Sequence, residues 1–536
     1  MKKQIILCIG ITILFLGACI TSSIAIDNPI TPINSGNTLY VGGTGPSNYT
    51  KIQDAIDNAS DGDVIFVFNG TYQEKTIKIE KTIKLLGEDR NTTILDGEFS
   101  EGIIVTIKSR DVTISGFTFQ KCYQDGFGEA ICIWNKTYSL ENIIISDCVI
   151  KECDRGIYYV DVDNLVITNC DFNDNDGQVT WGTSSSNIKI SKCLSHNNGV
   201  DLGGYTIIPG AFYFDDVCSD VKIYNCTLYY NIGFSIFFTE GYNFEIYHNH
   251  IYQNSWYGIL VCRFGEMLKN IDIHDNHIHN NYHSGLNVEY VTEPGINIFN
   301  NNISRNGHSD NIFRNGGIII KGSNECVTIK NNNIFSNDGF GIYTVSSGIL
   351  IMENNISKNS KQGVYSKKEF IDITRNIITH NMEGINLNNE FDNVSENIIS
   401  DNEIGINISR NYNNIFSNII SNNEIGIYIS GEYNKIFRNE ISNNNEGIKL
   451  YGEIYPLNGN NISYNNFLKN NNEVFFKFIN PEKFRIHTFN YFNQNYWNRK
   501  RVFPKPIVGI TEWLGFNFPK FYFDWNPAKV PYDIGI

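Results

Sequence analysis

Histidine is unevenly distributed along the chain, and its clustering suggests a metal site. Of the ten histidines, six lie within residues 248–283. When the segments IYHNHIYQN and IHDNHIHNN are aligned, His250 and His277 share one position and His279 follows two residues later. Imidazoles about 5 Å apart on neighbouring strands can share a Zn²⁺ or Cu²⁺ ion, with a fourth ligand from Asp275 or His283. The alternative is a set of exposed polar residues in turns.

Acidic residues gather just upstream of these histidines. Asp215 and Asp216 lie in one segment, and Glu240 and Arg263 occupy the corresponding places in the next two. Paired carboxylates can serve as acid and base in glycoside hydrolysis, or they can hold a cation such as Ca²⁺ while Arg263 removes a proton in a lyase reaction. The alternative is a solvated acidic loop edge.

Aromatic residues recur in the same segments at a fixed place after a Gly-Ile-like pair. If residues such as Ile157 and Phe212 point inward, the next residue of each strand points outward. The predicted outward column begins with Tyr158, Thr180, Tyr213, Phe237 and Leu260. Exposed rings stacked about 5 Å apart would offer pyranose rings a flat face, although aromatics also favour ordinary sheet surfaces. A carbohydrate ligand is therefore predicted to lie between Tyr158 and Arg263.

These residues sit on a repeat that determines the fold. Its first asparagine falls at intervals of 22, 21, 21 and 21 residues, at Asn354, Asn376, Asn397, Asn418 and Asn439. Each repeat has room only for short Ile/Val/Tyr-rich strands separated by Asn and Gly. The period is too short for a helical repeat and predicts stacked coils of parallel β-strands with an aliphatic interior.

The asparagine position is predicted to be a structural corner. Asparagine tolerates the left-handed backbone region, and its amide can bond backbone groups and stack into a ladder. Upstream the same position holds Cys148, Cys170, Cys193 and Cys226, which are expected to form a buried stack. One other pair, Cys122 and Cys153, could be oxidised outside the cell.

The segment before the repeats carries a specific resemblance. In TKIQDAIDNASDGDVIFVFNGTY the apolar residues Ile52, Ala55, Ile56 and Ala59 have helical spacing, which predicts a short helix over the open first coil. This segment, with TIKLLGED and TTILDG after it, resembles the start of right-handed parallel β-helix proteins of the pectate-lyase-like superfamily. The Asn-Ile/Gly-Ile repeats resemble its archaeal NosD-type members. The resemblance implies an outer-face site but assigns no catalytic residue.

The predicted fold class is therefore all-β, a single right-handed parallel β-helix capped at both ends. We expect an N-terminal cap with the first coils over residues 38–110. Repeating coils should follow over residues 111–480. Residues 481–536, rich in aromatics and proline, should form the C-terminal cap.

The first residues predict export. Met1-Lys2-Lys3 precedes an apolar stretch too short to span a bilayer but suited to a signal peptide. Cleavage after Ser23-Ile24-Ala25 would remove residues 1–25, whereas Leu16-Gly17-Ala18-Cys19 resembles a lipobox that would lipidate Cys19. Only this terminus is expected to hold the protein to a membrane, and an extracellular or cell-surface location follows. Several Asn-X-Ser/Thr sequons would then permit N-glycosylation.

Charge excludes one class of partner. With 42 Lys and Arg against 57 Asp and Glu, the net charge is −15, so the chain lacks the basic surplus of a nucleic-acid binder. A polyanion could be held only at a local basic spot. The leading interpretation is an exported surface protein that binds a polysaccharide or cell-surface glycan, with no reaction assigned. The alternatives are a polysaccharide lyase or glycoside hydrolase, and a NosD-like copper-binding accessory protein.

Overall fold

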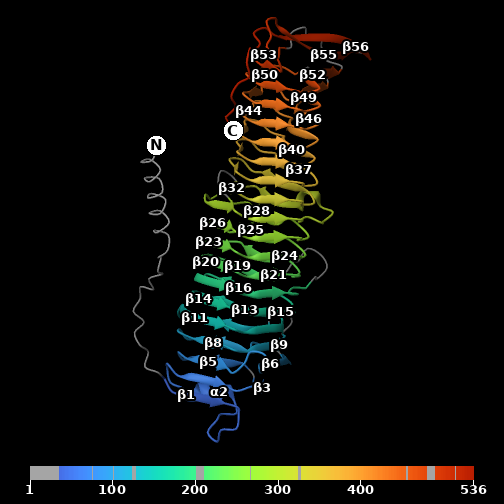
Figure 1. Ribbon diagram of the computed structural model, residues 1–536. Coiled ribbons are helices and arrows are strands. Elements are labelled where there is room, and N and C mark those ends of the chain that lie inside the picture. The colour runs from blue at the N-terminus through green and yellow to red at the C-terminus, as the bar shows by residue number, and fades with distance from the viewer. Residues whose placement is uncertain are drawn as a thin grey trace, which may run out of the picture.

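The computed structural model describes residues 36–535 except 75, 101, 124–127, 201–209, 266, 292, 324–326, 454–456, 480–488 and 514. The predicted signal peptide and Cys19 lie outside the described residues. The described chain is almost entirely β-structure, with strands stacked in sequence order from β1 (Thr38–Val41) at one end to β56 (Phe516–Asp524) at the other (Figure 1). None of its helices is long and apolar enough to cross a bilayer.

Each coil of the stack contributes three short strands, and we call the resulting sheets the first-, second- and third-strand sheets. One coil contains β40 (Glu383–Leu387), β41 (Asn393–Ser395) and β42 (Ile398–Ser400). These strands pair in parallel with β43 (Ile404–Ile408), β44 (Asn414–Phe416) and β45 (Ile419–Ser421) of the next coil. The structure thus confirms the predicted parallel β-solenoid.

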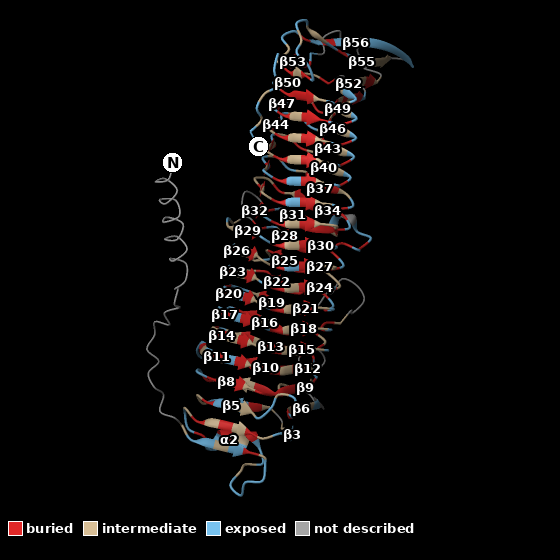
Figure 2. Ribbon diagram, in the orientation of Figure 1, coloured by how far each residue is buried: buried red, intermediate tan, exposed pale blue. Residues whose placement is uncertain are grey.

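The interior is filled by columns of identical side chains. Ile385 pairs with Ile406, which pairs with Ile427, and all three are fully buried. Buried residues alternate with exposed ones along the strands because successive side chains point to opposite faces (Figure 2). The repeat therefore builds one continuous apolar core along the solenoid.

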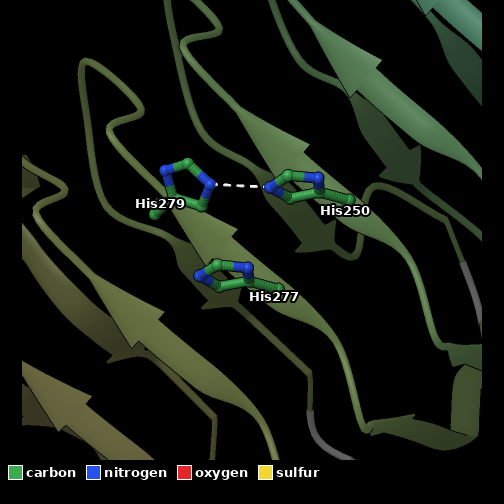
Figure 3. A group of neighbouring side chains, drawn as sticks. All are labelled: His250, His277 and His279. Atoms are coloured by element: carbon green, nitrogen blue, oxygen red, sulfur yellow. Dashed lines mark hydrogen bonds between the residues drawn. The ribbon is translucent and has the colours of Figure 1, made fainter.

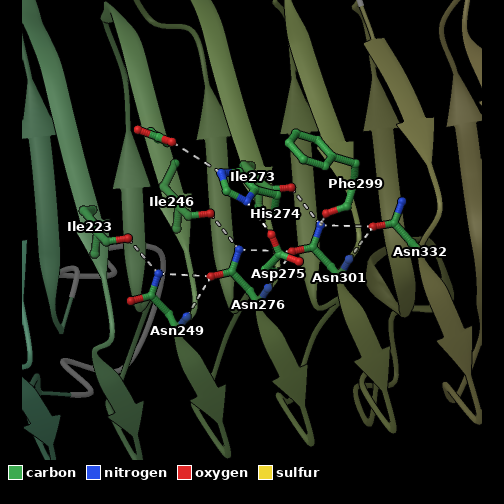
Figure 4. A network of polar contacts seen from close by, with 11 residues as sticks. Ile223, Ile246, Asn249, Ile273, His274, Asp275, Asn276, Phe299, Asn301 and Asn332 are labelled. Atoms are coloured by element: carbon green, nitrogen blue, oxygen red, sulfur yellow. Dashed lines mark hydrogen bonds and ion pairs between the residues drawn. The ribbon is translucent and has the colours of Figure 1, made fainter. Parts of the chain in front are cut away.

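Asparagine side chains link successive coils at the corners. Asn249 donates its Nδ2 to the carbonyl oxygen of Ile223 at 2.8 Å and to Oδ1 of Asn276 at 3.0 Å. Asn276 makes the same bond to Asn301, and the ladder continues to Asn332 (Figure 4). Each ladder amide is therefore buried and bonded, as a structural corner requires.

The left-handed backbone position is not the asparagine itself, which corrects one expectation. It belongs to the residue before the asparagine, as at Glu396 (φ 57°) before Asn397 and Ser417 (φ 55°) before Asn418. The asparagine is selected by its side-chain bonds, whereas the strained position accepts several residue types. The four cysteines that share the asparagine position are buried as predicted, and Cys226 N–H still donates to Asn249 Oδ1 at 3.0 Å.

Both ends of the solenoid are covered. Helix α2 (Ile52–Asn58) buries Ile52, Ala55 and Ile56 against the first coil, as the spacing predicted. At the other end β55 (Lys505–Trp513) and β56 form an antiparallel hairpin. Trp497 is buried next to this hairpin and donates its Nε1–H to Oδ2 of Asp524 at 3.0 Å.

Candidate functional site

The predicted outward column exists on the first-strand sheet, with one correction to its register. Tyr158 of β13 (Arg155–Val160) pairs with Trp181 of β16 (Thr180–Thr183), which pairs with Tyr213 of β19 (Phe212–Asp215). Thr180 pairs with the inward residues of its neighbours and is fully buried. Trp181, not Thr180, is therefore the outward residue of its coil.

The rings of this column differ in exposure, since Tyr158, Trp181 and Tyr213 are half-buried whereas Phe237 is buried. Tyr213 and Phe237 of β22 (Ile236–Phe238) stack on one another, with centroids 5.1 Å apart and planes 18° apart. Phe237 is only 7% exposed because it packs in a cluster with Phe234, Tyr257 and Leu260. The expectation of an exposed ring at Phe237 is wrong, since aromatic neighbours cover the outward side of the sheet.

The acidic residues lie along one rim of the same sheet. Asp215 is the last residue of β19, and its Oδ1 accepts a hydrogen bond from Thr239 Oγ1 at 2.7 Å. Asp216 follows with a positive φ of 48°, while Glu240 and Arg263 follow the next two first strands. Burial and the neighbouring Asp215 carboxylate raise the pKa of the Tyr213 hydroxyl. The catalytic roles of these acidic residues and of Arg263 stay predictions, since the structure assigns them no reaction.

A buried polar cluster lies one coil beyond Arg263, and of its residues the sequence analysis named only His283, as a candidate metal ligand. His283, Ser284 and Asn287 are buried at the start of β28 (Leu286–Glu289). His283 Nδ1, Ser284 Oγ and Asn287 Oδ1 have no hydrogen-bond partner among the described residues. Asn287 Nδ2 donates to Glu289 Oε1 at 3.0 Å, and the same oxygen accepts a bond from Lys321 Nζ at 3.0 Å. Buried polar atoms without a hydrogen-bond partner are rare in folded proteins, so this cluster stands out.

Burial and neighbouring positive charges keep His283 of this polar cluster neutral. Burial, together with the nearby cations of Arg314 and Lys321, lowers the pKa of His283 to about 4. Burial and the Glu289 carboxylate raise the pKa of Tyr257, whose ring centroid lies 5.2 Å from that of His283. At neutral pH the imidazole of His283 and the phenol of Tyr257 are therefore both uncharged.

Three cations lie over aromatic rings near the polar cluster, and we call this group the cation–aromatic patch. Arg314 lies 5.1 Å from the ring centroid of Trp256, and Lys361 lies 5.3 Å from that of Phe340. Lys367 lies within 6 Å of three ring centroids, those of Phe313 (5.2 Å), Tyr343 (5.9 Å) and Tyr365 (5.6 Å). Among the described residues, no salt bridge involves any of the three cations.

Sequence reasoning named His283 as a candidate metal ligand but missed this polar cluster and patch, for a physical reason. Ser and Asn occur throughout the repeats, so Ser284 and Asn287 carry no signal of their own. Arg314 reaches the sheet from the short 3₁₀ helix η1 (Ile312–Arg314), far from Trp256 in sequence. The basic residues before and after β37 (Gln362–Ser366) would have been a signal, since the strand places both on one outer face.

The predicted histidine cluster forms on the third-strand sheet. His250 of β24 (His250–Tyr252) pairs with His277 of β27 (His277–His279), and their rings stack 5.0 Å apart (Figure 3). Nε2 of His250 lies 2.7 Å from Nε2 of His279. One ring nitrogen from each of the three histidines falls within 4.8 Å of the others. Burial lowers the pKa of all three imidazoles, that of His279 to about 4.

The two residues expected to complete this cluster are engaged elsewhere. Asp275 accepts a hydrogen bond from Nδ1 of His274 at 2.7 Å. His283 lies on the other face of the coil, 4.7 Å from the ring centroid of Trp256. Within the described part of the chain, the group that could share one ion consists of His250, His277 and His279.

Comparisons with known proteins agree with this architecture. The family model described as the right-handed β-helix region matches residues 86–216, 209–316 and 316–468. These segments are more than half of the chain, and the chain belongs to the right-handed β-helix family. No curated protein matches its sequence.

Several solved structures resemble the fold at low sequence identity. The Dettilon tailspike protein shows 15% identity and a TM-score of 0.45, over 60% of this chain and 67% of its own. The catalytic unit of an α-1,3-glucanase from Streptomyces thermodiastaticus shows 12% identity and a TM-score of 0.41, over 64% and 61%. A mannuronic-acid-specific family 6 lyase from human gut microbiota shows 14% identity and a TM-score of 0.35, over 71% and 86%.

Proposed function

We propose that this protein binds an anionic polysaccharide, one carrying carboxylate or sulfate groups, across the outer face of the first-strand sheet between Trp256 and Lys367. The observation that carries the proposal is the cation–aromatic patch. Arg314, Lys361 and Lys367 gather on one face of a chain whose net charge is −15. A local concentration of unpaired cations in an acidic protein creates an attractive potential for an anionic ligand.

The buried polar cluster supplies the second part of the argument. His283 Nδ1, Ser284 Oγ and Asn287 Oδ1 are buried without partners beside the patch. Ser284 and Asn287 are fully buried, so a sugar hydroxyl can donate to the amide oxygen or imidazole nitrogen and accept from the serine hydroxyl only once the covering side chains move. These atoms lack the bonds that buried polar groups normally make, so a ligand that satisfies them gains affinity.

The shape of the face favours a polymer over a small anion. The patch and the polar cluster extend over five neighbouring first strands, from β25 (Ile259–Cys262) to β37. At about 4.8 Å per strand these span roughly 19 Å, which is the length of several sugar residues. An extended chain crossing the strands can therefore contact all three cations together.

Binding to matched polysaccharides tests the proposal. Isothermal titration should show binding of polygalacturonate, alginate or chondroitin sulfate but not of neutral dextran, and added salt should weaken it. Lys367→Ala should lower the affinity about tenfold, since it removes a charge-assisted contact. Lys368→Ala removes an equal charge from the exposed neighbouring residue and should leave the affinity unchanged. Equal binding of neutral and anionic polymers, or equal effects of the two variants, would overturn the proposal.

Cleavage of the bound polysaccharide is a second candidate function, and the Tyr257–His283 pair favours it. A neutral imidazole can accept a proton, and a protonated phenol can donate one to a leaving oxygen. The protein should be incubated with the polyuronates it binds, and new chain ends should be counted. Product formation that His283→Ala abolishes while binding persists would support a reaction. Binding without new ends under all conditions would leave a binding protein.

Export to the cell surface is part of the same proposal. It rests on the charged, apolar and small-residue pattern of residues 1–25. Mass spectrometry of the protein from its native cells should find an N-terminus near residue 26 or a lipid on Cys19. An intracellular protein that retains Met1 would refute export.

A further inference from the structure

Three imidazoles from two neighbouring coils meet on the third-strand sheet, a different sheet from that of the polysaccharide face. His250 and His277 occupy paired positions of β24 and β27, and His279 is two residues further along β27. Positions two apart point to the same side of a strand, so all three rings stand on the outer face (Figure 3). Their backbones are held in register by the parallel ladder, so the cluster is built on a rigid element.

We propose that His250, His277 and His279 bind one divalent transition-metal ion of the Zn²⁺ type and leave an open coordination position toward solvent. One ring nitrogen of each lies within 4.8 Å of the others, so rotation of the side chains can bring all three onto one ion. Three protein ligands with a fourth position left open is an established arrangement for Zn²⁺.

The ligand set determines the class of metal. The group within reach of one ion contains three imidazoles and, among the described residues, no carboxylate. Imidazole suits Zn²⁺, Cu²⁺ and Ni²⁺, whereas Ca²⁺ and Mg²⁺ require oxygen ligands. The donor set thus excludes Ca²⁺ at this cluster. The sequence suggested Ca²⁺ only for the carboxylates near Asp215.

Binding requires the three rings to rotate. Two nitrogens on a tetrahedral Zn²⁺ at about 2.0–2.1 Å would lie about 3.3 Å apart. Nε2 of His250 and Nε2 of His279 lie 2.7 Å apart, in a hydrogen bond that one of them donates. A shift of that proton to Nδ1, and rotation of the side chains including that of His277, would bring the three nitrogens to the spacing that the ion requires.

Asn280 is placed to support the metal-bound form. Its side-chain amide lies 2.9 Å from Nδ1 of His279. A flip of the amide presents its oxygen to an Nδ1–H, which leaves Nε2 of His279 free for the ion. Outer hydrogen bonds of this kind orient metal-bound histidines, so Asn280 is a positioning residue.

Zinc titration of the full-length, tag-free protein after chelator dialysis tests the proposal. The parent should bind one Zn²⁺ per chain with a micromolar or lower Kd, and excess Ca²⁺ should not compete. His277→Ala and His279→Ala should each weaken binding about 100-fold or more. His308→Ala removes an exposed histidine outside the cluster and should leave the affinity unchanged. Asn280→Ala should weaken binding by about 10- to 100-fold.

A second readout separates loss of the site from loss of the fold. Co²⁺ added to the parent should give the visible absorption of a four-coordinate site, and His279→Ala should lack it while its far-ultraviolet circular dichroism matches the parent. The proposal is overturned if the parent binds no Zn²⁺. It is also overturned if the His250→Ala/His277→Ala pair binds as tightly as the parent, or if Ca²⁺ displaces the ion.

Discussion

Asn397 and Asn418 are joined by two hydrogen bonds that converge on one oxygen. Oδ1 of Asn418 accepts the side-chain Nδ2–H of Asn397 and its backbone N–H, both at 3.0 Å. Nδ2 of Asn397 also donates to the carbonyl oxygen of Ile373 at 2.8 Å. One side chain thus closes the corner of its own coil and ties it to the coils on either side.

Replacement of this asparagine should therefore destabilise the solenoid. Asn397→Leu leaves a buried carbonyl and a buried amide without partners, which should lower the free energy of unfolding by roughly 1–3 kcal/mol. Urea denaturation measures the change. Asn355→Leu is the matched control because that side chain is exposed, and it should change stability by about 0.5 kcal/mol or less. If both variants unfold like the parent, the ladder contributes nothing measurable.

The fold could be predicted from sequence because each coil repeats the same local requirements. The interval near 21 residues, the isoleucine columns and the asparagine corners are all local or nearest-coil features, and the structure confirms them. The residue in the left-handed region could not be predicted, because that position holds Glu, Ser or Arg with no common chemistry.

The candidate sites show where sequence reasoning reaches its limit. The histidine cluster was predictable because His250 and His277 occupy the same position of successive coils. The outward aromatic column was misjudged because Phe234 and Tyr257, three residues before the column, cover Phe237. Such covering depends on packing between coils of unequal length, which a one-dimensional alignment cannot represent.

Successive coils approach so closely at one column of glycines that a side chain would not fit. We therefore predict that glycine is required at these positions. A Cβ added at Gly384 would lie 2.5 Å from the carbonyl oxygen of Gly405 and 2.8 Å from Cγ2 of Ile399. Gly384→Ala should lower the unfolding free energy by about 1–3 kcal/mol, since neither neighbour can move without disturbing the core. Gly515→Ala, at φ +81° in open space, should cost only about 1 kcal/mol. Equal losses would show that crowding is not the cause.

The buried cysteines should be chemically inert in the folded protein. Burial raises the pKa of the Cys218 and Cys262 thiols to about 12, so almost no thiolate exists at pH 8. Because the thiolate is the reactive form, iodoacetamide should leave both residues unmodified until denaturant is added. Peptide mass spectrometry locates the label. Rapid labelling of either residue in the native protein would contradict the burial described here.

One carboxylate replaces an asparagine in a corner ladder, and it should make stability depend on pH. Asp392 is fully buried, and its backbone N–H donates to Oδ1 of Asn413 at 2.9 Å. In the same way, the backbone N–H of Asn413 donates to Oδ1 of Asn434. Burial raises the pKa of Asp392 to about 7, although Ile371 N–H and Asn389 Nδ2 both donate to Oδ1. In the unfolded chain the pKa returns to about 4.

The sign of the effect follows from proton binding. Between pH 4 and 7 the folded state holds a proton on Asp392 that the unfolded state has lost, so stability falls as the pH rises through this range. The stabilising contribution of this proton is complete below about pH 4 and lost above about pH 7. Asp392→Asn keeps the shape without the charge, so it should stabilise the protein at pH 8 by roughly 2–4 kcal/mol and flatten the profile. Urea denaturation at pH 5 and pH 8 measures both effects, with the exposed Asp401→Asn as control. A variant that is no more stable than the parent at pH 8 would show that Asp392 stays charged without cost in the fold.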